Sequence, residues 1–248
     1  MAKTVLITGG TTGIGRCTAY KFGNNGFNVA FTSRNIVRGE KFEAELKSKG
    51  IEATFFQLDV TDEEAVKTTV EKTVGKYGAL DTIVNNAGIS GETKLLGDNS
   101  TENFREMIET NVMGVYYGMK YAIRYFLNAG GGKIVNLASI AGLNGIPYAV
   151  QYGATKHAVV GLTKGAAVEY ASKNIRVNAV APCAVKTDIL RTAIESGTYN
   201  EDIMGAMNPI NRMGVPEEIA SAIYFLASED ATIVNGAILS ADGGFNAK

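Results

Sequence analysis

The sequence contains no tryptophan, one histidine, four prolines and two cysteines in 248 residues. Cys17 and Cys183 lie far apart and form no metal-ligand pattern, and so few cysteines are typical of a protein of the reducing cytoplasm. Positive and negative charges are balanced, because the chain has 24 Lys and Arg and 25 Asp and Glu. A nucleic-acid-binding protein would normally show an excess of basic residues, so this balance argues against that class. Polar and turn residues interrupt the uncharged stretch at 134–151, so we predict no membrane span. We expect no secretory signal and no metal site.

Glycine is the one abundant residue type to note, with 29 copies, while hydrophobic residues make up 46% of the chain. This composition is typical of a folded globular protein. Short apolar runs alternate with longer amphipathic patterns, and no linker or repeat interrupts them. We predict strands at 4–8, 28–32, 53–58, 80–84, 132–137, 175–180 and 237–240, and helices at 13–22, 37–49, 62–77, 102–126, 151–171 and 217–226. Thr61 is expected to cap the helix at 62–77.

Strands that alternate with helices predict a parallel β-sheet with helices on both faces. The fold class is therefore α/β, a doubly wound, Rossmann-type sheet in a single domain spanning residues 1–248. Ligands of such sheets bind beyond the carboxyl ends of the strands. The segment at about 186–215 breaks the alternation and contains several methionines, so we expect it to form a loop over the substrate.

A glycine-rich loop joins the first predicted strand to the first helix. Gly9 would permit a sharp turn, Gly13 would let the backbone approach a pyrophosphate, and Gly15 would let the helix pack tightly on the sheet. The amino end of the helix would then supply N–H donors and a partial positive charge to the phosphates. The spacing is not G-x-G-x-x-G, so a turn that serves only the fold is the alternative interpretation.

The end of the second predicted strand indicates which dinucleotide would bind. An NAD site favours a carboxylate here, to accept hydrogen bonds from the ribose diol. This chain instead has Ser33 and Arg34, a hydrogen-bond donor and a cation that suit a 2′-phosphate. We therefore predict NADP(H), with NAD(H) as the alternative cofactor, and an ordinary surface role for Arg34 as the alternative for that residue.

Tyr152 and Lys156 are spaced to share one face of a helix, and Ser139 stands thirteen residues earlier, at the end of a predicted strand. An ammonium near a phenol favours the phenolate, so we expect Lys156 to lower the pKa of Tyr152. The strand end and the helix start would converge at the carboxyl edge of the sheet. The three residues therefore predict an acid–base site, with a strand-end cap as the alternative interpretation of Ser139.

Several motifs stand in a fixed order along the whole chain: Thr8-Gly9-x-x-x-Gly13-x-Gly15, Asp59, Asn-Asn-Ala-Gly at 85–88, Asn111, Ser139, Tyr152-x-x-x-Lys156 and Ala-Asp-Gly-Gly at 241–244. In this order they resemble the single-domain branch of the short-chain dehydrogenase/reductase family. Within that branch the chain is similar to 3-oxoacyl carrier-protein reductases and hydroxysteroid dehydrogenases. The resemblance implies an NADP-dependent enzyme that acts on CH–OH groups.

The resemblance also implies roles for individual residues. Tyr152 would be the general acid or base, Ser139 would hydrogen-bond the substrate oxygen, and Lys156 would hold the nicotinamide ribose. Asn111 would hold a water that links Lys156 to solvent; a buried, purely structural asparagine is the alternative. The implied cofactor-binding residues are Gly9, Thr11, Thr12, Gly13, Ile14, Gly15, Ser33, Arg34, Asp59, Val60, Asn86, Ala87, Gly88, Tyr152, Lys156, Pro182, Val185 and Thr187.

One position departs from the family pattern, because Cys183 follows Pro182 where the family usually has glycine. The cysteine side chain would narrow the pocket or point away from it. Residues expected to face the substrate are mostly apolar: Leu143, Ile146, Tyr148, Ile189, Leu190, Met204 and Met207. They predict a hydrophobic ketone or a hydroxysteroid-like alcohol as the small-molecule substrate.

Other functions remain open from the sequence. A 3-oxoacyl carrier-protein reductase would dock its acidic partner through basic residues, but 126–132 before the fifth predicted strand contains none. A sugar or polyol dehydrogenase is a further option. A non-catalytic nucleotide-binding scaffold or sensor is the alternative from another class. The family commonly forms homotetramers, and the apolar segments 112–125 and 158–168 predict a homotetramer or homodimer.

Overall fold

Seven parallel strands form one sheet in the order β3-β2-β1-β4-β5-β6-β7. The computed structural model describes residues 2–187, 190, 194 and 200–247. The strands are β1 (Thr4–Ile7), β2 (Asn28–Ser33), β3 (Ala53–Gln57), β4 (Thr82–Asn85), β5 (Gly132–Leu137), β6 (Ile175–Pro182) and β7 (Ile238–Ala241). The strand order reverses between β1 and β4, which is the switch point where doubly wound sheets bind ligands. The predicted doubly wound sheet is confirmed.

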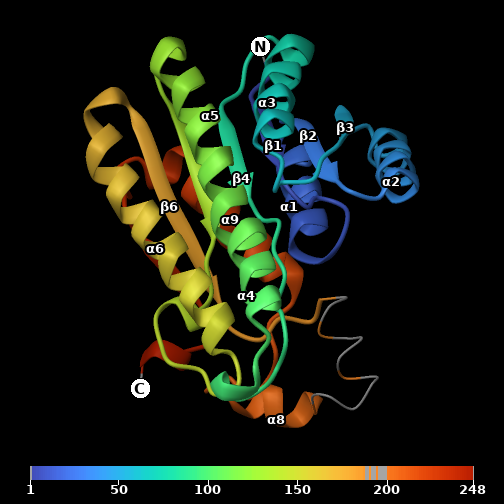
Figure 1. The fold of residues 1–248 in the computed structure, drawn as a ribbon. Helices are drawn as coiled ribbons and strands as arrows, with labels where there is room; N and C mark the ends of the chain where they lie inside the picture. The colour runs from blue at the N-terminus through green and yellow to red at the C-terminus, as the bar shows by residue number, and fades with distance from the viewer. Residues whose placement is uncertain (1, 188–189, 191–193, 195–199, 248) are drawn as a thin grey trace.

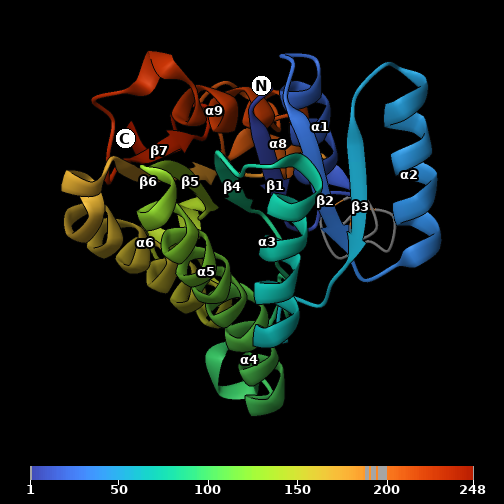
Figure 2. The same cartoon turned by 90° about the horizontal axis from the view of Figure 1, so that it is seen from above.

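Helices cover both faces of the sheet. They are α1 (Gly13–Gly23), α2 (Ile36–Ser48), α3 (Glu63–Tyr77), α4 (Thr101–Ile108), α5 (Gly114–Ala129), α6 (Val150–Tyr170), α8 (Glu201–Ala206) and α9 (Pro216–Ala227). Figure 2 shows α3, α5 and α6 on one face and α1 and α9 on the other. The two faces bury separate apolar clusters, one around Phe126 and Ile134 and the other around Phe22 and Phe31. Figure 1 shows α4 and α8 in the lower half of the molecule, and Figure 2 shows that they lie well apart, on the sides of α5 and α9 respectively.

Two local predictions are corrected by the structure. The third helix is capped by Asp62, whose carboxylate accepts the Ala65 amide at 3.0 Å, and not by Thr61, which donates to Asp59 instead. The single helix predicted at 102–126 is two helices, α4 and α5, joined by a π-helical turn over Glu109–Met113. The extra residue of a π turn shifts the helical register, and such turns are frequent at functional sites.

Two points of the chain beyond β6, outside the strands of the sheet, are held side by side. An isolated parallel bridge pairs Val185 with Gly214, with the Lys186 amide donating to Gly214 at 2.9 Å and the Gly214 amide donating to Ala184 at 3.0 Å. The segment predicted to cover the substrate therefore starts and ends at neighbouring points beyond the carboxyl end of β6. Ile189, expected to face the substrate, lies outside the described residues.

Candidate active site

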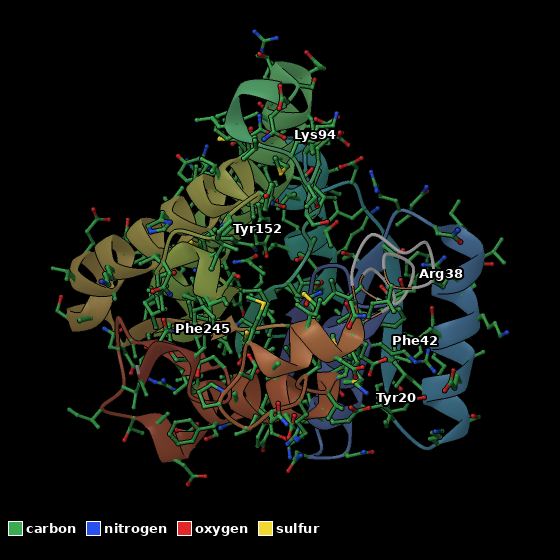
Figure 3. The ribbon with its side chains drawn as sticks, turned by 90° about the horizontal axis from the view of Figure 1, so that it is seen from below. Tyr20, Arg38, Phe42, Lys94, Tyr152 and Phe245 are labelled. Atoms are coloured by element: carbon green, nitrogen blue, oxygen red, sulfur yellow. The ribbon has the colours of Figure 1, made fainter. Side chains whose placement is uncertain are left out.

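A cavity of about 560 Å³ lies at the carboxyl end of the strands, within the usual size range of small-molecule sites. It is lined by these predicted site residues: Gly9, Thr11, Thr12, Gly13, Ile14, Ser33, Arg34, Asp59, Val60, Asn86, Ala87, Gly88, Ser139, Tyr152, Lys156, Pro182, Val185 and Thr187. Two predicted residues, Gly15 and Asn111, do not line it. Figure 3 looks onto this end from below, with Tyr152 near the centre, Arg38 on the side of α2 and Lys94 toward α4.

The glycine loop and the start of α1 form one wall of the cavity. Thr12, which precedes α1, makes no side-chain capping bond, so the first amides of the helix are left for another acceptor. Gly13 has φ +49°, and a Cβ there would stand 3.2 Å from the Thr187 side chain. Gly15 packs behind the loop, where a Cβ would stand 2.3 Å from the Gly9 carbonyl oxygen. The wall therefore fits a pyrophosphate at the helix terminus.

Two cations stand at the end of this wall. Arg34 follows β2, and Arg38 lies in the first turn of α2, whose N-cap Asn35 accepts the Arg38 amide at 2.9 Å. Within the described ranges neither guanidinium is in an ion pair, and no carboxylate stands at the end of β2. Unpaired guanidinium groups suit a phosphate monoester better than a ribose diol. The sequence analysis did not identify Arg38. The one sequence signal for it is its spacing of four residues from Arg34.

Ser139 and Tyr152 meet at the other end of the cavity. Ser139 lies two residues beyond the end of β5, and its Oγ accepts the Ala141 amide at 3.1 Å. The same hydroxyl is close enough to the Tyr152 phenol to act against the rise of the phenol pKa. The serine therefore serves both as the cap of the turn at Ile140–Gly142 and as a partner of the phenol. A group that binds here has a hydroxyl and a phenol within reach, the pair needed to hold and protonate a carbonyl oxygen.

The expected effect of Lys156 on Tyr152 is not seen in this arrangement. Burial raises the pKa of Tyr152, and the opposing influence comes from its hydrogen bond with Ser139. The Lys156 ammonium lies 5.6 Å from the centre of the Tyr152 ring and donates to the Leu137 carbonyl oxygen at 2.7 Å. Burial also lowers the pKa of Lys156 itself to about 8.

Asn111 lies in the π-helical turn and is fully buried. Its Oδ1 accepts the Ile89 amide and its Nδ2 donates to the Ile89 carbonyl oxygen, both at 2.8 Å, and Nδ2 also reaches the Thr155 hydroxyl at 3.2 Å. The side chain thus holds the loop after β4 against α6. A Cβ on Gly88 would stand 3.1 Å from the Asn111 Oδ1 and 3.8 Å from the Lys156 Nζ, so the three residues are neighbours. The relay role of Asn111 stays a prediction.

Comparison with known proteins identifies the family. A family model described as Enoyl-(Acyl carrier protein) reductase matches residues 9–246. The chain is 41% identical to the 2,5-dichloro-2,5-cyclohexadiene-1,4-diol dehydrogenase of Sphingobium indicum, over 99% of this chain and 97% of that protein. It is 40% identical to the cyclohexanol dehydrogenase of an Acinetobacter species, over 99% of this chain and 96% of that protein. The chain belongs to the short-chain dehydrogenase/reductase family.

A solved structure of ElxO with NADP bound is similar over the full length of both chains, with a TM-score of 0.96 and 46% identity. Membership of the short-chain dehydrogenase/reductase family makes the protein an oxidoreductase, as predicted. The NADP of ElxO agrees with the preference for NADP(H) inferred from Arg34. The roles of the individual site residues are tested by none of these similarities and remain predictions.

The remaining wall of the cavity is mostly apolar. Among the residues expected to face a substrate, Ile146, Tyr148, Leu190, Met204 and Met207 line it, whereas Leu143 does not. Cys183, the departure from the short-chain dehydrogenase/reductase pattern, also lines it. Further lining residues that the sequence did not single out are Thr32, Asn35, Leu58, Thr110, Leu137, Ala138 and Ala184. Of the described lining residues, only Arg34, Arg38 and Lys156 are cationic, so this wall offers no free positive charge to an acidic substrate.

Proposed function

We propose that the protein is an NADP(H)-dependent oxidoreductase that interconverts an apolar ketone and its secondary alcohol. The observation that carries the proposal is one continuous cavity, with Arg34 and Arg38, which form no ion pair with any described residue, at one end and Ser139 and Tyr152 at the other. The uncapped start of α1 between them fits the pyrophosphate of a dinucleotide. The bound nicotinamide would supply or accept the hydride.

The residues of the chain would manage the proton. Burial holds the pKa of Tyr152 above its usual value, which keeps the phenol protonated and ready to donate to a carbonyl oxygen. Ser139, fixed by the Ala141 amide, would orient that oxygen. Lys156, with a pKa of about 8, would exchange protons near neutral pH and hold the ribose. Asn111 would complete the connection to solvent as proposed for its relay role.

The apolar wall supports a neutral, hydrophobic substrate. Met204 and Met207 are unbranched and adaptable, and together with Ile146 and Tyr148 they would contact a ring or an aliphatic body. Two relatives are named for cyclic alcohols, which agrees with such a substrate. We further propose that the segment at about 186–215 is the substrate loop of a single 1–248 domain.

Assembly and location are also proposals. Exposed apolar side chains on two long helices, Tyr116 of α5 and Val168 of α6, support a homotetramer or homodimer, which sedimentation would test. The low cysteine content of the chain, Cys17 and Cys183 in 248 residues, supports a reducing, cytoplasmic location. Within the part of the chain that the structure describes, none of the helices combines the length and the hydropathy that a membrane span requires.

Turnover with each nicotinamide tests the function. We expect the purified protein to oxidise NADPH faster than NADH with a cyclic or steroid ketone, and a keto sugar and an acetoacetyl thioester would test the polyol and carrier-protein alternatives. Tyr152→Phe should lower kcat about 10²–10⁴-fold, the usual contribution of a general acid. Tyr170→Phe, at the far end of α6, is the matched control and should leave kcat unchanged. Tight NADPH binding without turnover would instead favour a non-catalytic sensor.

A further inference from the structure

The end of the chain after β7 forms a turn held by a buried carboxylate. Asp242 is 7% exposed, and its Oδ1 accepts the Gly244 amide at 3.0 Å. Its Oδ2 accepts both the Asn246 amide at 3.0 Å and the Asn246 Nδ2 at 2.6 Å. Asp242 therefore fixes where the side chain of Asn246 points. In Figure 1 the C-terminus lies at the same lower end of the molecule as α8.

Asn246 contacts one wall of the substrate region. Its Oδ1 accepts the Asn144 Nδ2 at 2.6 Å, and Asn144 belongs to the segment that runs from Ser139 into α6. Among the described residues, this is the one hydrogen bond that joins 143–149 to a part of the chain distant in sequence. The other hydrogen bonds of 143–149 are made to the Ile140 carbonyl oxygen, within the segment itself, or with the first turn of α6. The same segment carries Tyr148 with φ +61°, a strained conformation for a bulky residue that persists only when its surroundings hold it.

The same turn contacts the opposite wall. The Gly243 carbonyl oxygen accepts the Ile210 amide at 3.2 Å, and Ile210 lies four residues beyond α8, the helix that carries Met204. Gly243 has φ +61°, and a Cβ there would stand 2.6 Å from the Ile210 Cγ1. A Cβ on Gly244 would stand 3.3 Å from Pro209. The turn therefore packs closely against 209–210, and a side chain at Gly243 or Gly244 would not fit there without displacing this contact.

We propose that Asn246 and Asp242 are positioning residues that hold the two walls of the substrate region at a fixed spacing, and so set the affinity for the carbonyl substrate. The inference rests on the proposed function. The acid–base groups do not depend on this turn, because Ser139 is held by the Ala141 amide and Lys156 by the Leu137 carbonyl oxygen. The expected effect is therefore on KM for the carbonyl substrate and not on kcat or on KM for NADPH.

Kinetics of Asn246→Ala, Asn144→Ala and the double variant test the proposal. Each single change should raise KM for the ketone about five- to tenfold, as expected for loss of the hydrogen bond that the two side chains share, with kcat and KM for NADPH within about twofold of wild type. The double variant should have a KM no higher than that of the more affected single variant, because both changes remove this shared bond. Asn128→Ala, which loses a bond within α5, is the matched control and should change none of these constants.

Hydrogen exchange of Asn246→Ala gives a readout that needs no substrate. Amide exchange should accelerate in 140–149 and 203–213 and stay unchanged in β1, β4 and β5. If wild type reduces no ketone, the proposed function fails while exchange still tests the positioning role. If Asn246→Ala does not fold, Asn144→Ala, which leaves the bonds within the turn intact, provides the same test. Unchanged KM with unchanged exchange, or equal changes throughout the sheet and in NADPH binding, would overturn the proposal.

Discussion

Replacing Lys156 by methionine should stabilise the protein while it abolishes turnover. Lys156 is 5% exposed, and its ammonium donates to the Leu137 carbonyl oxygen. Burial disfavours the charged form, and this is the cause that lowers the pKa from 10.5 to about 8. Methionine fills a similar volume with an unbranched, uncharged chain, so the substitution removes the penalty at the cost of one hydrogen bond.

The magnitude follows from the pKa. Because each pKa unit is worth about 1.4 kcal/mol, the lysine destabilises the folded state by about 3 kcal/mol at pH 7. The lost hydrogen bond returns about 1 kcal/mol, so Lys156→Met should gain about 2 kcal/mol, or about 4–8 °C in Tm for a chain of this size. Between pH 8 and 10.5 the folded wild type binds fewer protons than the unfolded chain, so its stability rises with pH. The variant has no such titration. The difference in stability between the two proteins should therefore shrink by about 1 kcal/mol between pH 7 and pH 9.

Thermal unfolding of the cofactor-free protein between pH 7 and 9 measures both quantities. Lys164→Met, an exposed lysine on the same helix, is the matched control and should show neither a gain nor a change with pH relative to wild type. If Lys156→Met is less stable than wild type at pH 7, or if the difference between them does not narrow as pH rises, then the reasoning from burial is wrong.

Two further predictions concern specificity and packing. Arg34→Ala and Arg38→Ala should each raise KM for NADPH about 5- to 30-fold, because each loses a charge-assisted contact with the 2′-phosphate. KM for NADH, measured in the same assay, should stay within twofold of wild type. Equal effects on both cofactors would contradict the assignment of the two arginines to the 2′-phosphate. Gly118→Ala should lower the free energy of unfolding by about 1–3 kcal/mol in urea titrations, because its Cβ would stand 2.1 Å from the Asn85 Oδ1 at the buried contact of α5 with β4; an unchanged midpoint would show that Asn85 moves freely.

Much of the fold was predictable because strand and helix patterns are local. The apolar runs gave seven strands, and the glycine loop between Ile7 and α1 indicated a dinucleotide-binding end. The π-helical turn at Glu109–Met113 was not predictable, because its extra residue leaves the apolar periodicity on both sides intact. Asp62 and Thr61 are both good capping residues, and only the backbone path decides between them.

The sequence predicted which residues form the candidate site better than it predicted their hydrogen bonds and pKa values. Spacing placed Tyr152 and Lys156 on one helix, but it does not say that the ammonium turns to the Leu137 carbonyl oxygen. Arg38 lies four residues beyond Arg34 on a surface helix, where a cation is ordinary, so only the cavity reveals it. The contact between Asn144 and Asn246 joins residues 102 positions apart, and no local pattern marks such a pair.

The bridge between Val185 and Gly214 makes the intervening stretch replaceable. Its two ends are held side by side, so a longer or shorter replacement need not displace β6 or α9. Doubling the length of a closed loop costs only about 0.6 kcal/mol of chain entropy. A graft exchanged after Thr187 and before Pro209 would keep the contacts of Thr187 with Gly13 and of Ile210 with Gly243. The scaffold would therefore tolerate it, and evolution or an engineer could change what the enzyme accepts without rebuilding the part that handles the nucleotide.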